Sequence, residues 1–520
     1  MRIRPLALVL LLGLAAGGGW GRAGEREAAA PPPPPPLSTP YAYTAADGLL
    51  LDEIEERTFR FFWDLADRNT RLIPDRYPSP SFSSIAAVGF GLTAYPIGAE
   101  RGWVTRAQAA ERTLATLRFL LRAPQGPEAR GVAGYRGFFY HFLDMPTGRR
   151  FETVELSTID SSLLFAGALF SQGYFDRPDP TERAIRRAAE ALYLRADWRW
   201  IQPRKPRVAM GWTPEERFHG WDWRGYNEAM ILYVLALGSP THPIDPAAWL
   251  AYTSTYTWAA SSYGGGEHVP FAPLFGHQYS EVWIDVRGLG DDFLRAHGID
   301  YFENARRATY AQWGYAIANP MQWRGYGADL WGLSACDGPI DATLPYRAGE
   351  RTEERRFMTY AARGAAPSEV RDDGTICPAA AGSSLPFAPE IVLPALYAMR
   401  ERYGRDLFGP YGFLDAFNPS FTYADVTLHH GRLAPGKGWF DTDYLGIDQG
   451  PLLAMIENAR TGLVWKFMRK SPHVVRGLRR AGFSGGWLSA LPPPRPSPVP
   501  GKHALPDRTL RTAPSAAGGR

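Results

Sequence analysis

The sequence predicts an all-α fold, a toroid in which apolar inner helices are surrounded by amphipathic outer ones. Two observations predict it. Apolar residues recur at the i, i+3, i+4 spacing of a helix through most of the 520-residue chain, whereas alternating strand patterns are scarce. Segments 163–169 and 230–237 are apolar on nearly every side. Helices buried all round require a second layer outside them, which the amphipathic helices can supply.

Each predicted helix rests on this periodicity. The first places Leu50, Ile54 and Phe59 on one face, and the second does the same with Leu114 and Leu117. In chain order, the predicted helices span residues 49–68, 105–121, 161–171, 180–194, 228–237, 301–318, 391–403 and 450–469. The loops between them are long and rich in Gly, Pro, Trp and Tyr, and long ordered loops in a compact domain commonly carry function.

The two ends of the chain differ in composition from the middle. Residues 1–24 have the basic, apolar and small-residue zones of a secretory signal peptide, with an apolar run too short to span a bilayer. Residues 25–40 read as a Pro-rich linker, and residues 486–520 as a disordered Pro- and Arg-rich tail. We therefore expect a single catalytic domain over residues 41–485, in a protein that is periplasmic or secreted.

The composition narrows the range of partners and cofactors. A formal net charge of +4 is too small for this length to indicate nucleic acid or anionic membrane as a partner. No segment after the first 24 residues is apolar enough to cross a bilayer. The chain has no GxGxxG or HExxH motif, so no cofactor or metal is expected. Its two cysteines, Cys336 and Cys377, either form a disulfide or stand apart as small residues, and the sequence leaves this and the oligomeric state open.

Carboxylates lie at or just before the beginnings of three predicted apolar helices. Glu155 and Asp160 precede the third predicted helix, Glu228 begins the fifth, and Asp448 comes just before the last. Each has an ordinary explanation as a helix cap or as an acid of the first turn. Trp, Tyr and Arg residues close to Glu228 and Asp448 in sequence favour a second explanation, because caps do not require aromatic neighbours and sugar sites commonly use them.

The chemistry of glycosidic bonds explains why such acids would be grouped. Cleavage requires one carboxyl group that protonates the departing oxygen and another that activates water or attacks the anomeric carbon. A helix N-terminus favours the ionised carboxylate, which suits a base. A general acid at such a position needs burial or a second carboxylate to raise its pKa. Glu228 is the candidate for that condition, with Glu155 or Asp160 close to it.

Polar and aromatic residues in the loops are the candidates for substrate binding. Some have ordinary explanations, because residues 275–287 can be polar surface and Asp337-Gly-Pro is a turn signal. The candidates are Trp221, Trp223, Tyr226, His277, Gln278, Tyr279, Trp283, Asp285, Arg287, Tyr326, Trp331, Asp337 and Gln449.

Seven stretches resemble the glycoamylase-like family, which includes bacterial β-1,2-glucanases and the related domain of cyclic β-1,2-glucan synthases. These are 155–160 (ELSTID), 226–229 (YNEA), 237–243 (LGSPTHP), 275–279 (FGHQY), 331–335 (WGLSA), 384–390 (SLPFAPE) and 447–451 (IDQGP). The resemblance implies an (α/α)6 barrel and hydrolysis of β-1,2-glucan with inversion of the anomeric centre. It further implies that Glu228 is the acid and Asp448 the base, and that Glu155 and Asp160 line the cleft.

Two other functions stay open at this point. One is a hydrolase or transglycosylase of the same barrel that acts on another α- or β-glucan. The other is a non-catalytic glycan-binding protein of the cell envelope, which would need the aromatic residues but not the acid. The Arg-rich, irregular segment from about 341 to 380 fits the family pattern less well. If it lies over the cleft, it leaves open whether cleavage is internal or from a chain end.

Overall fold

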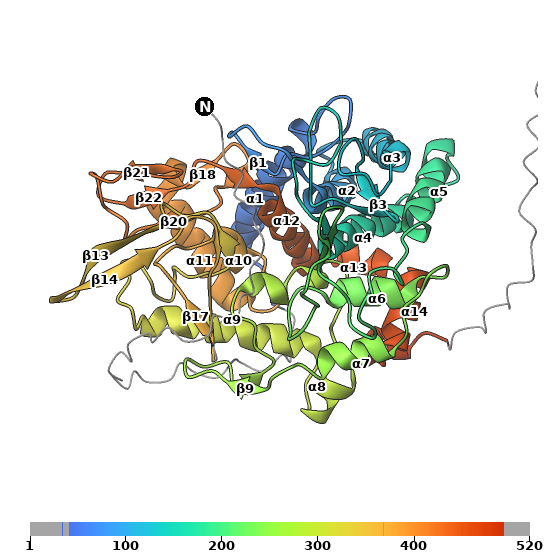
Figure 1. Ribbon diagram of the computed structural model, residues 1–520. Helices are drawn as coiled ribbons and strands as arrows, with labels where there is room; N and C mark the ends of the chain where they lie inside the picture. Colours follow the sequence, from blue (N-terminus) through green and yellow to red (C-terminus); the bar gives the residue numbers. More distant parts are fainter. Residues whose placement is uncertain (1–33, 35–40, 368, 493–520) are drawn as a thin grey trace, which may run out of the picture.

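The computed structural model describes residue 34, residues 41–367 and residues 369–492 (Figure 1). The predicted signal peptide, nearly all of the predicted linker and residues 493–520 of the predicted tail lie outside the described residues. Residues 486–492, which the sequence predicts as part of the disordered tail, are described and include a short helix over Gly486–Ser489. The described part is mostly helical, as the sequence predicts. Within it, no helix combines the length and apolar character that a membrane span requires.

Helices run from one end of the described chain to the other. The α-helices are α1 (Ala45–Asp64), α2 (Ile85–Glu100), α3 (Arg106–Arg122), α4 (Thr158–Tyr174), α5 (Pro180–Leu194), α6 (Met230–Gly238), α7 (Ala247–Thr253), α8 (Asp292–Ala296), α9 (Tyr301–Ala318), α10 (Pro378–Gly382), α11 (Pro389–Tyr403), α12 (Gly446–Arg460), α13 (Leu463–Met468), α14 (Pro472–Arg480) and α15 (Gly486–Ser489). Short 3-10 helices are η1 (Leu274–His277), η2 (Ser280–Val282) and η3 (Gly404–Asp406).

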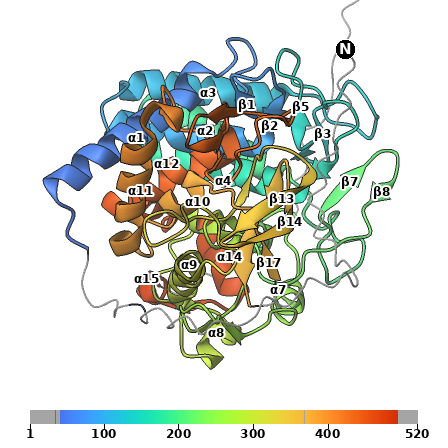
Figure 2. The ribbon, with the colours of Figure 1, turned by 90° about the vertical axis from the view of Figure 1, so that its left-hand side faces the viewer.

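Five helices form an inner layer. Almost every residue of α2, α4, α6, α10 and α12 is buried, as expected for helices that are apolar on all sides. They contact one another in the order α10, α12, α2, α4, α6. In Figures 1 and 2, α2, α4 and α12 lie in the middle of the molecule.

Amphipathic helices pack against the outside of this layer. Helix α1 contacts α2 and α12, α3 contacts α2, α5 contacts α4, α11 contacts α10, and α14 contacts α6. Their N-termini carry caps that the sequence encodes, such as the Thr44–Asp47 box of α1 and the Thr105–Gln108 box of α3. Two layers of helices, the inner one buried, are thus present as predicted.

The connecting loops contain short antiparallel strands, each paired with one or two others. They are β1 (Arg76–Tyr77), β2 (Ser83–Ser84), β3 (Gly134–Tyr135), β4 (Phe138–Phe139), β5 (Phe142–Leu143), β6 (Leu156–Ser157), β7 (Gly211–Thr213), β8 (Arg217–Phe218), β9 (Ala259–Ala260), β10 (Glu267–His268), β11 (Leu289–Gly290), β12 (Ala335–Cys336), β13 (Ala342–Ala348), β14 (Arg351–Phe357), β15 (Ala361–Ala362), β16 (Gly364–Ala366), β17 (Glu369–Arg371), β18 (Phe408–Gly409), β19 (Gly412–Phe413), β20 (Phe417–Asn418), β21 (Arg432–Ala434), β22 (Gly438–Phe440), β23 (Tyr444–Leu445) and β24 (Ser484–Gly485).

The segment interpreted as irregular contains a hairpin. Strands β13 and β14 pair over seven residues each, from Ala342↔Phe357 to Ala348↔Arg351, and extend away from the helices (Figure 1). The strand propensity of this Arg-rich stretch was hidden because most of its side chains are exposed and polar, so it lacks an apolar face.

Three helix predictions need correction. The helix predicted over 450–469 is two helices, because Gly462 adopts a left-handed conformation with φ 68° between α12 and α13. The helix predicted from Glu228 begins at Met230, so Glu228 precedes the helix. Asp448 is not an N-cap, because α12 already begins at Gly446.

Candidate active site

The four predicted catalytic carboxyl groups lie close to the beginnings of inner helices. Asp160 is the third residue of α4, Glu155 precedes β6, Glu228 comes two residues before α6, and Asp448 is the third residue of α12. Asp160, Glu228 and Asp448 are 4%, 5% and 3% exposed. Buried acids at these positions cannot be explained as ordinary solvated caps.

His141 joins the first two carboxylates. Its Nδ1 lies 2.8 Å from Glu155 Oε1, and its Nε2 lies 3.5 Å from Asp160 Oδ1. Burial would lower the pKa of His141, but the charges of Asp160 and Glu155 raise it to about 9. Burial likewise opposes ionisation of Glu155, yet the imidazolium holds the pKa of that carboxyl below its usual range. His141 is therefore a cation between two carboxylates at neutral pH.

Asp160 is also held by the cap of α4. The Ser157 side chain accepts a hydrogen bond from the Asp160 backbone N–H at 3.2 Å, and the Ser157 hydroxyl donates to the Asp160 carboxylate. Ser157 is therefore the N-cap of α4. Capping and a position in the carboxylate cluster are thus properties of the same residue.

Glu228 has the environment of a proton donor. Burial, reinforced by the charge of Asp160, raises the pKa of Glu228 to about 7, and its Oε2 has no hydrogen-bond partner within the described residues. Its backbone is fixed by Ser280, whose hydroxyl donates to the Glu228 carbonyl at 2.6 Å and accepts from the Ile231 N–H at 2.9 Å. Asn227 accepts hydrogen bonds from the Ala229 N–H at 3.1 Å and from a tyrosine, Tyr252, at 2.7 Å.

Tyr279 connects Glu228 with Asp448. The Tyr279 hydroxyl lies 3.5 Å from Asp448 Oδ1, and burial together with the charges of Asp448 and Glu228 raises the pKa of this phenol well above its usual range. The next residue is Ser280, which holds the Glu228 backbone. One short segment therefore contacts both residues that were predicted as acid and base.

Asp448 belongs to a dense group of aspartates. Burial raises the pKa of Asp448 to about 7, a hydrogen bond with Asp415 opposes this rise, and the charges of Asp337 and Asp75 add to it. Burial and the charge of Asp448 raise the pKa of Asp415 well above its usual range. Asp415 also accepts the Asp337 backbone N–H at 2.8 Å. Burial and mutual repulsion therefore oppose ionisation of both carboxyl groups, and the two titrate as a pair.

Arg76 and His430 supply positive charge to this group. Arg76 donates to Asp337 at 2.7 Å, and His430 Nε2 lies 2.9 Å from Asp441 Oδ1 and 3.2 Å from Asp443 Oδ2. Burial opposes the charged imidazole, but the hydrogen bonds to both aspartates raise the pKa of His430 to about 10.

The same donors have the spacing of a metal site. Ligand atoms of Asp337, His430 and Asp441 all lie within 4.8 Å of one another. In this structure the His430 imidazole is bonded to Asp441 and Asp443.

Tyr360 reaches the aspartates from the segment that fitted the family pattern poorly. Strand β12 pairs with β15 in the register Cys336↔Ala361, which places Tyr360 opposite Asp337. Burial and the charges of Asp448 and Asp415 raise the pKa of the Tyr360 hydroxyl well above its usual range. The side chain is partly exposed, so it stands at the border of the cluster.

Several predicted binding residues lie in or next to this region. Tyr226, two residues before Glu228, stacks on His277 with ring centroids 4.7 Å apart, and burial lowers the pKa of His277 to about 3, so that it is neutral. Trp223 is buried and its indole N–H donates to Thr158 at 3.0 Å, whereas Trp221 is 41% exposed.

The two predicted glutamines fix backbone near the cluster. Gln278 donates to the Ala380 carbonyl at 2.7 Å, and Gln449 donates to the Phe413 carbonyl at 2.9 Å. Gln449 adjoins Asp448, and its Oε1 has no partner in the described structure.

Three predicted binding residues from 283–287 are corrected to structural roles. Trp283 is fully buried, stacks on Phe90 and donates to Thr93 at 3.0 Å, so it belongs to the core. Asp285 and Arg287 form an ion pair at 2.8 Å. Arg287 lies over the ring of Trp465 on α13, which is part of the packing behind the inner helices.

Tyr326 and Trp331 are also placed apart from the carboxylates. The Tyr326 hydroxyl donates to Asp372 at 2.7 Å, beside α9. Trp331 is buried in the second apolar cluster of the molecule, defined by residues packed around α10 and α11. An aromatic side chain in a polar sequence context predicted binding at these positions, but the Trp331 ring fills a core and the Tyr326 ring is partly buried against it.

The two cysteines are buried free thiols, and a contact with Cys336 is the main cause that raises the pKa of the Cys377 thiol. Sequence reasoning assigned no role to the cluster residues that come from loops. These are Asp75, Arg76, His141, Tyr360, Asp415, His430, Asp441 and Asp443. Most stand as isolated charges without a helix or aromatic context; only the adjacent pair Asp75-Arg76 and the run 441–448 offered a signal.

Comparisons with known proteins agree with one another. Residues 220–472 match the family model described as "Glycoamylase: Putative glucoamylase". The chain is 31% identical to a putative glucoamylase of Bacteroides uniformis of known structure, with a TM-score of 0.69, covering 85% of this chain and 99% of that one. It is 27% identical to an endo-β-1,2-glucanase of Chitinophaga pinensis, solved with sophorotriose and glucose, with a TM-score of 0.70, covering 85% and 99%.

A relative whose activity is named was also found. Over 473 residues, the chain is 28% identical to an exo β-1,2-glucooligosaccharide sophorohydrolase (non-reducing end) of Parabacteroides distasonis. The match covers 84% of this chain but only 58% of that relative's length.

Proposed function

The chain belongs to the glycoamylase family, and from that membership we propose that it is a glycoside hydrolase that cleaves β-1,2-glucan. The observation that carries the proposal is the pair of buried carboxyl groups, Glu228 and Asp448, whose charges both raise the pKa of the Tyr279 hydroxyl. Relatives named as a β-1,2-glucanase and a sophorohydrolase support this substrate.

The proposed reaction divides the two proton transfers between these groups. Glu228 protonates the departing glycosidic oxygen, which its pKa of about 7 permits near neutrality. Asp448 accepts a proton from the water that attacks the anomeric carbon. The charge of Asp160, which also contacts His141, favours the protonated form of Glu228. The reaction proceeds with inversion, because water attacks directly.

We also propose a barrel architecture for this protein and its export from the cytoplasm. The two layers of helices are an (α/α)6 barrel, with the carboxylates at the ends of its inner helices. The succession of contacts from α10 through α12, α2 and α4 to α6 supports this arrangement. The basic, apolar and small-residue zones of residues 1–24 support export to the periplasm or the medium.

Purified protein incubated with linear β-1,2-glucan should release reducing ends. Replacement of Glu228 by Gln should lower kcat by about 100-fold or more, because the amide cannot donate the required proton. Proton NMR of the first products should detect the α-anomer before mutarotation.

A matched control is Glu281→Gln. Glu281 is equally buried, and burial also raises the pKa of Glu281 to about 7, but it accepts a hydrogen bond from Tyr226 that Gln can also accept. The activity of the Glu281→Gln variant should stay close to that of the unmodified protein. Release of reducing ends from another glucan but not from β-1,2-glucan would reject β-1,2-glucan as the substrate. Tight oligosaccharide binding without turnover, unchanged in Glu228→Gln, would identify a binding protein instead.

A further inference from the structure

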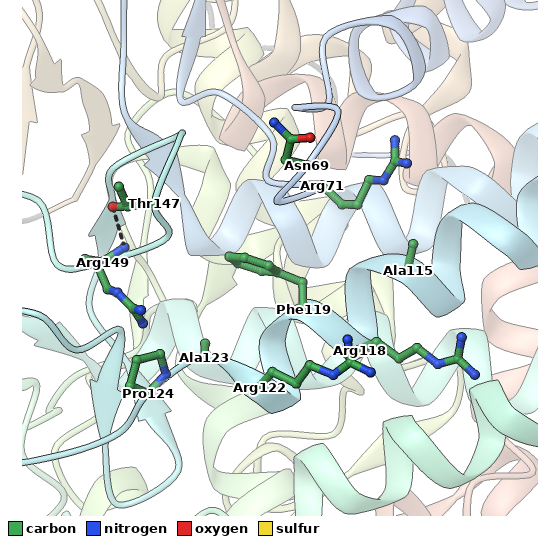
Figure 3. A pocket seen from close by; sticks show the side chains of 10 residues that line it. All are labelled: Asn69, Arg71, Ala115, Arg118, Phe119, Arg122, Ala123, Pro124, Thr147 and Arg149. Carbon is green, nitrogen blue, oxygen red and sulfur yellow. Dashed lines mark hydrogen bonds between the residues drawn. The ribbon is translucent and has the colours of Figure 1, made fainter.

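A pocket of about 400 Å³ lies between α3, the loop that follows α1 and the turn at 144–149 (Figure 3). It shares no lining residue with the carboxylate clusters. Its lining residues are Asn69, Arg71, Ala115, Arg118, Phe119, Arg122, Ala123, Pro124, Thr147 and Arg149.

Four guanidinium groups dominate the pocket. Arg118 and Arg122 are four residues apart on α3, Ala115 leaves room one turn earlier, and Arg71 and Arg149 approach from the two loops (Figure 3). Like charges at i, i+4 destabilise a helix. Within the described residues, none of these four side chains forms an ion pair or a hydrogen bond.

The acids of both loops are occupied by their own turns. Asp67 accepts hydrogen bonds from the Asn69 and Thr70 backbone N–H groups at 2.8 and 2.7 Å. Asp144 accepts from the Thr147 N–H at 3.0 Å and from its hydroxyl at 2.7 Å. The charge of Arg71 contributes to the lowered pKa of Asp67, but only after these hydrogen bonds. The positive charge of the pocket is therefore left for a ligand to neutralise.

Phe119 gives the pocket an apolar wall. Its ring is partly exposed and packs under Gly148, where φ is 65° and a Cβ atom would lie 2.3 Å from the ring. This close packing holds Thr147 and Arg149 at the rim. A flat ring beside guanidinium groups suits a ligand that joins an oxyanion to a sugar ring, because guanidinium forks match phosphate and aromatic rings stack on sugar faces.

We propose that this pocket binds the phosphate monoester of a phosphorylated saccharide. The site is separate from the carboxylate clusters, so the proposal does not depend on the hydrolase assignment. Its volume of about 400 Å³ accommodates one sugar phosphate.

Titration calorimetry at low salt tests the proposal with glucose 6-phosphate, inorganic phosphate and glucose as probes. Glucose 6-phosphate should bind more tightly than inorganic phosphate, and glucose should not bind at this site. The double variant Arg118→Gln, Arg122→Gln should weaken binding of glucose 6-phosphate at least about tenfold.

Two controls make the result specific. Arg187→Gln removes an exposed arginine of α5 outside the pocket and should leave the affinity unchanged. Glu228→Gln should also leave it unchanged, which separates this site from the proposed active site. Equal affinity of the double variant and the unmodified protein would overturn the proposal. Sedimentation with phosphatidylglycerol vesicles without binding of glucose 6-phosphate would overturn it in favour of a lipid headgroup.

Discussion

Glu228 is buried without an ionic partner, and its burial sets the pH range in which the carboxyl group can donate a proton. A position within a helical first turn would have stabilised the carboxylate. Because Glu228 precedes α6 and faces the charge of Asp160, desolvation prevails and the pKa rises to about 7. The structure thus meets the condition for a general acid that sequence reasoning could only state.

The pH dependence of kcat/KM should be bell-shaped and centred near neutrality. Glu228 acts when protonated, so activity is lost as pH rises through about 7. Asp448 acts when ionised, so activity is lost as pH falls below about 7. Asp337→Asn removes a charge that raises the pKa of Asp448, and should move only the acid limb, toward lower pH. A shift of the basic limb instead would contradict the assignment of the two roles.

Tyr360 is expected to bind substrate, because its hydroxyl lies among the aspartates at a partly exposed border. Tyr360→Phe should raise KM about 2–10-fold with little change in kcat, since it removes a hydrogen bond of about 0.5–1.5 kcal/mol. Steady-state kinetics on β-1,2-glucan oligosaccharides measure this. Tyr423→Phe is the control, because it removes a hydrogen bond to the Pro345 carbonyl at 2.8 Å away from the aspartates. A fall in kcat alone would exclude a binding role.

At the scale of elements, α2 and α4 approach so closely that only glycine fits at their contact. A Cβ atom at Gly167 would lie 2.0 Å from the Gly89 carbonyl oxygen, and one at Gly89 would lie 2.5 Å from the Leu163 carbonyl oxygen. This contact fixes α4, which carries Asp160, against the centre of the molecule. The glycines are thus part of what positions the site.

Gly167→Ala should lower the free energy of unfolding by about 1–3 kcal/mol, because the two helices must separate. Gly48→Ala is the matched control on α1, where no atom lies within 4 Å of the added methyl group. It should stabilise the protein by up to about 1 kcal/mol through helix propensity. Chemical denaturation of both variants measures the difference. Stabilisation by both substitutions would disprove the close packing of α2 and α4.

The residue pattern within each helix explains which helices the sequence predicted. Amphipathic helices such as α5 and α9 were found at nearly their observed bounds, because their apolar residues follow a clear period. Helix α2 was missed. It is apolar on all sides, and its interior contains Pro96 and three glycines, which are breaker signals in a sequence. Only tertiary packing shows that these residues are helical.

For the molecule as a whole, the sequence predicted those site residues that lie at the start of a helix. Glu228, Asp448 and Asp160 have a local signature, a carboxylate within a few residues of the start of an apolar helix. His141, Asp415 and His430 come from separate loops and acquire their roles only when the chain brings them together. Conversely, Trp283 and Trp331 stand among polar residues in the sequence, but their rings are buried in the core. Sequence pattern does not distinguish a ring that faces substrate from a ring that faces another helix.

The summed charges of these clusters predict how stability depends on pH. His141 and His430 have pKa values raised from 6.5 to about 9 and about 10 by neighbouring carboxylates. The folded protein thus keeps two protons that the unfolded chain has released. Their stabilisation is complete below about pH 6.5 and is lost as pH rises through about 9 and 10. The free energy of unfolding should therefore decrease between pH 7 and pH 9.

Denaturant titrations at pH 7, 8 and 9 measure this slope, to which each proton contributes about 1.4 kcal/mol per pH unit. His141→Gln and His430→Gln should each flatten it, because each removes one retained proton. His268→Gln should not, since burial lowers the pKa of His268 and the residue is neutral in both states above pH 7. If all three variants kept the slope of the unmodified protein, the two imidazoles would not be the cations that hold the carboxylate clusters together.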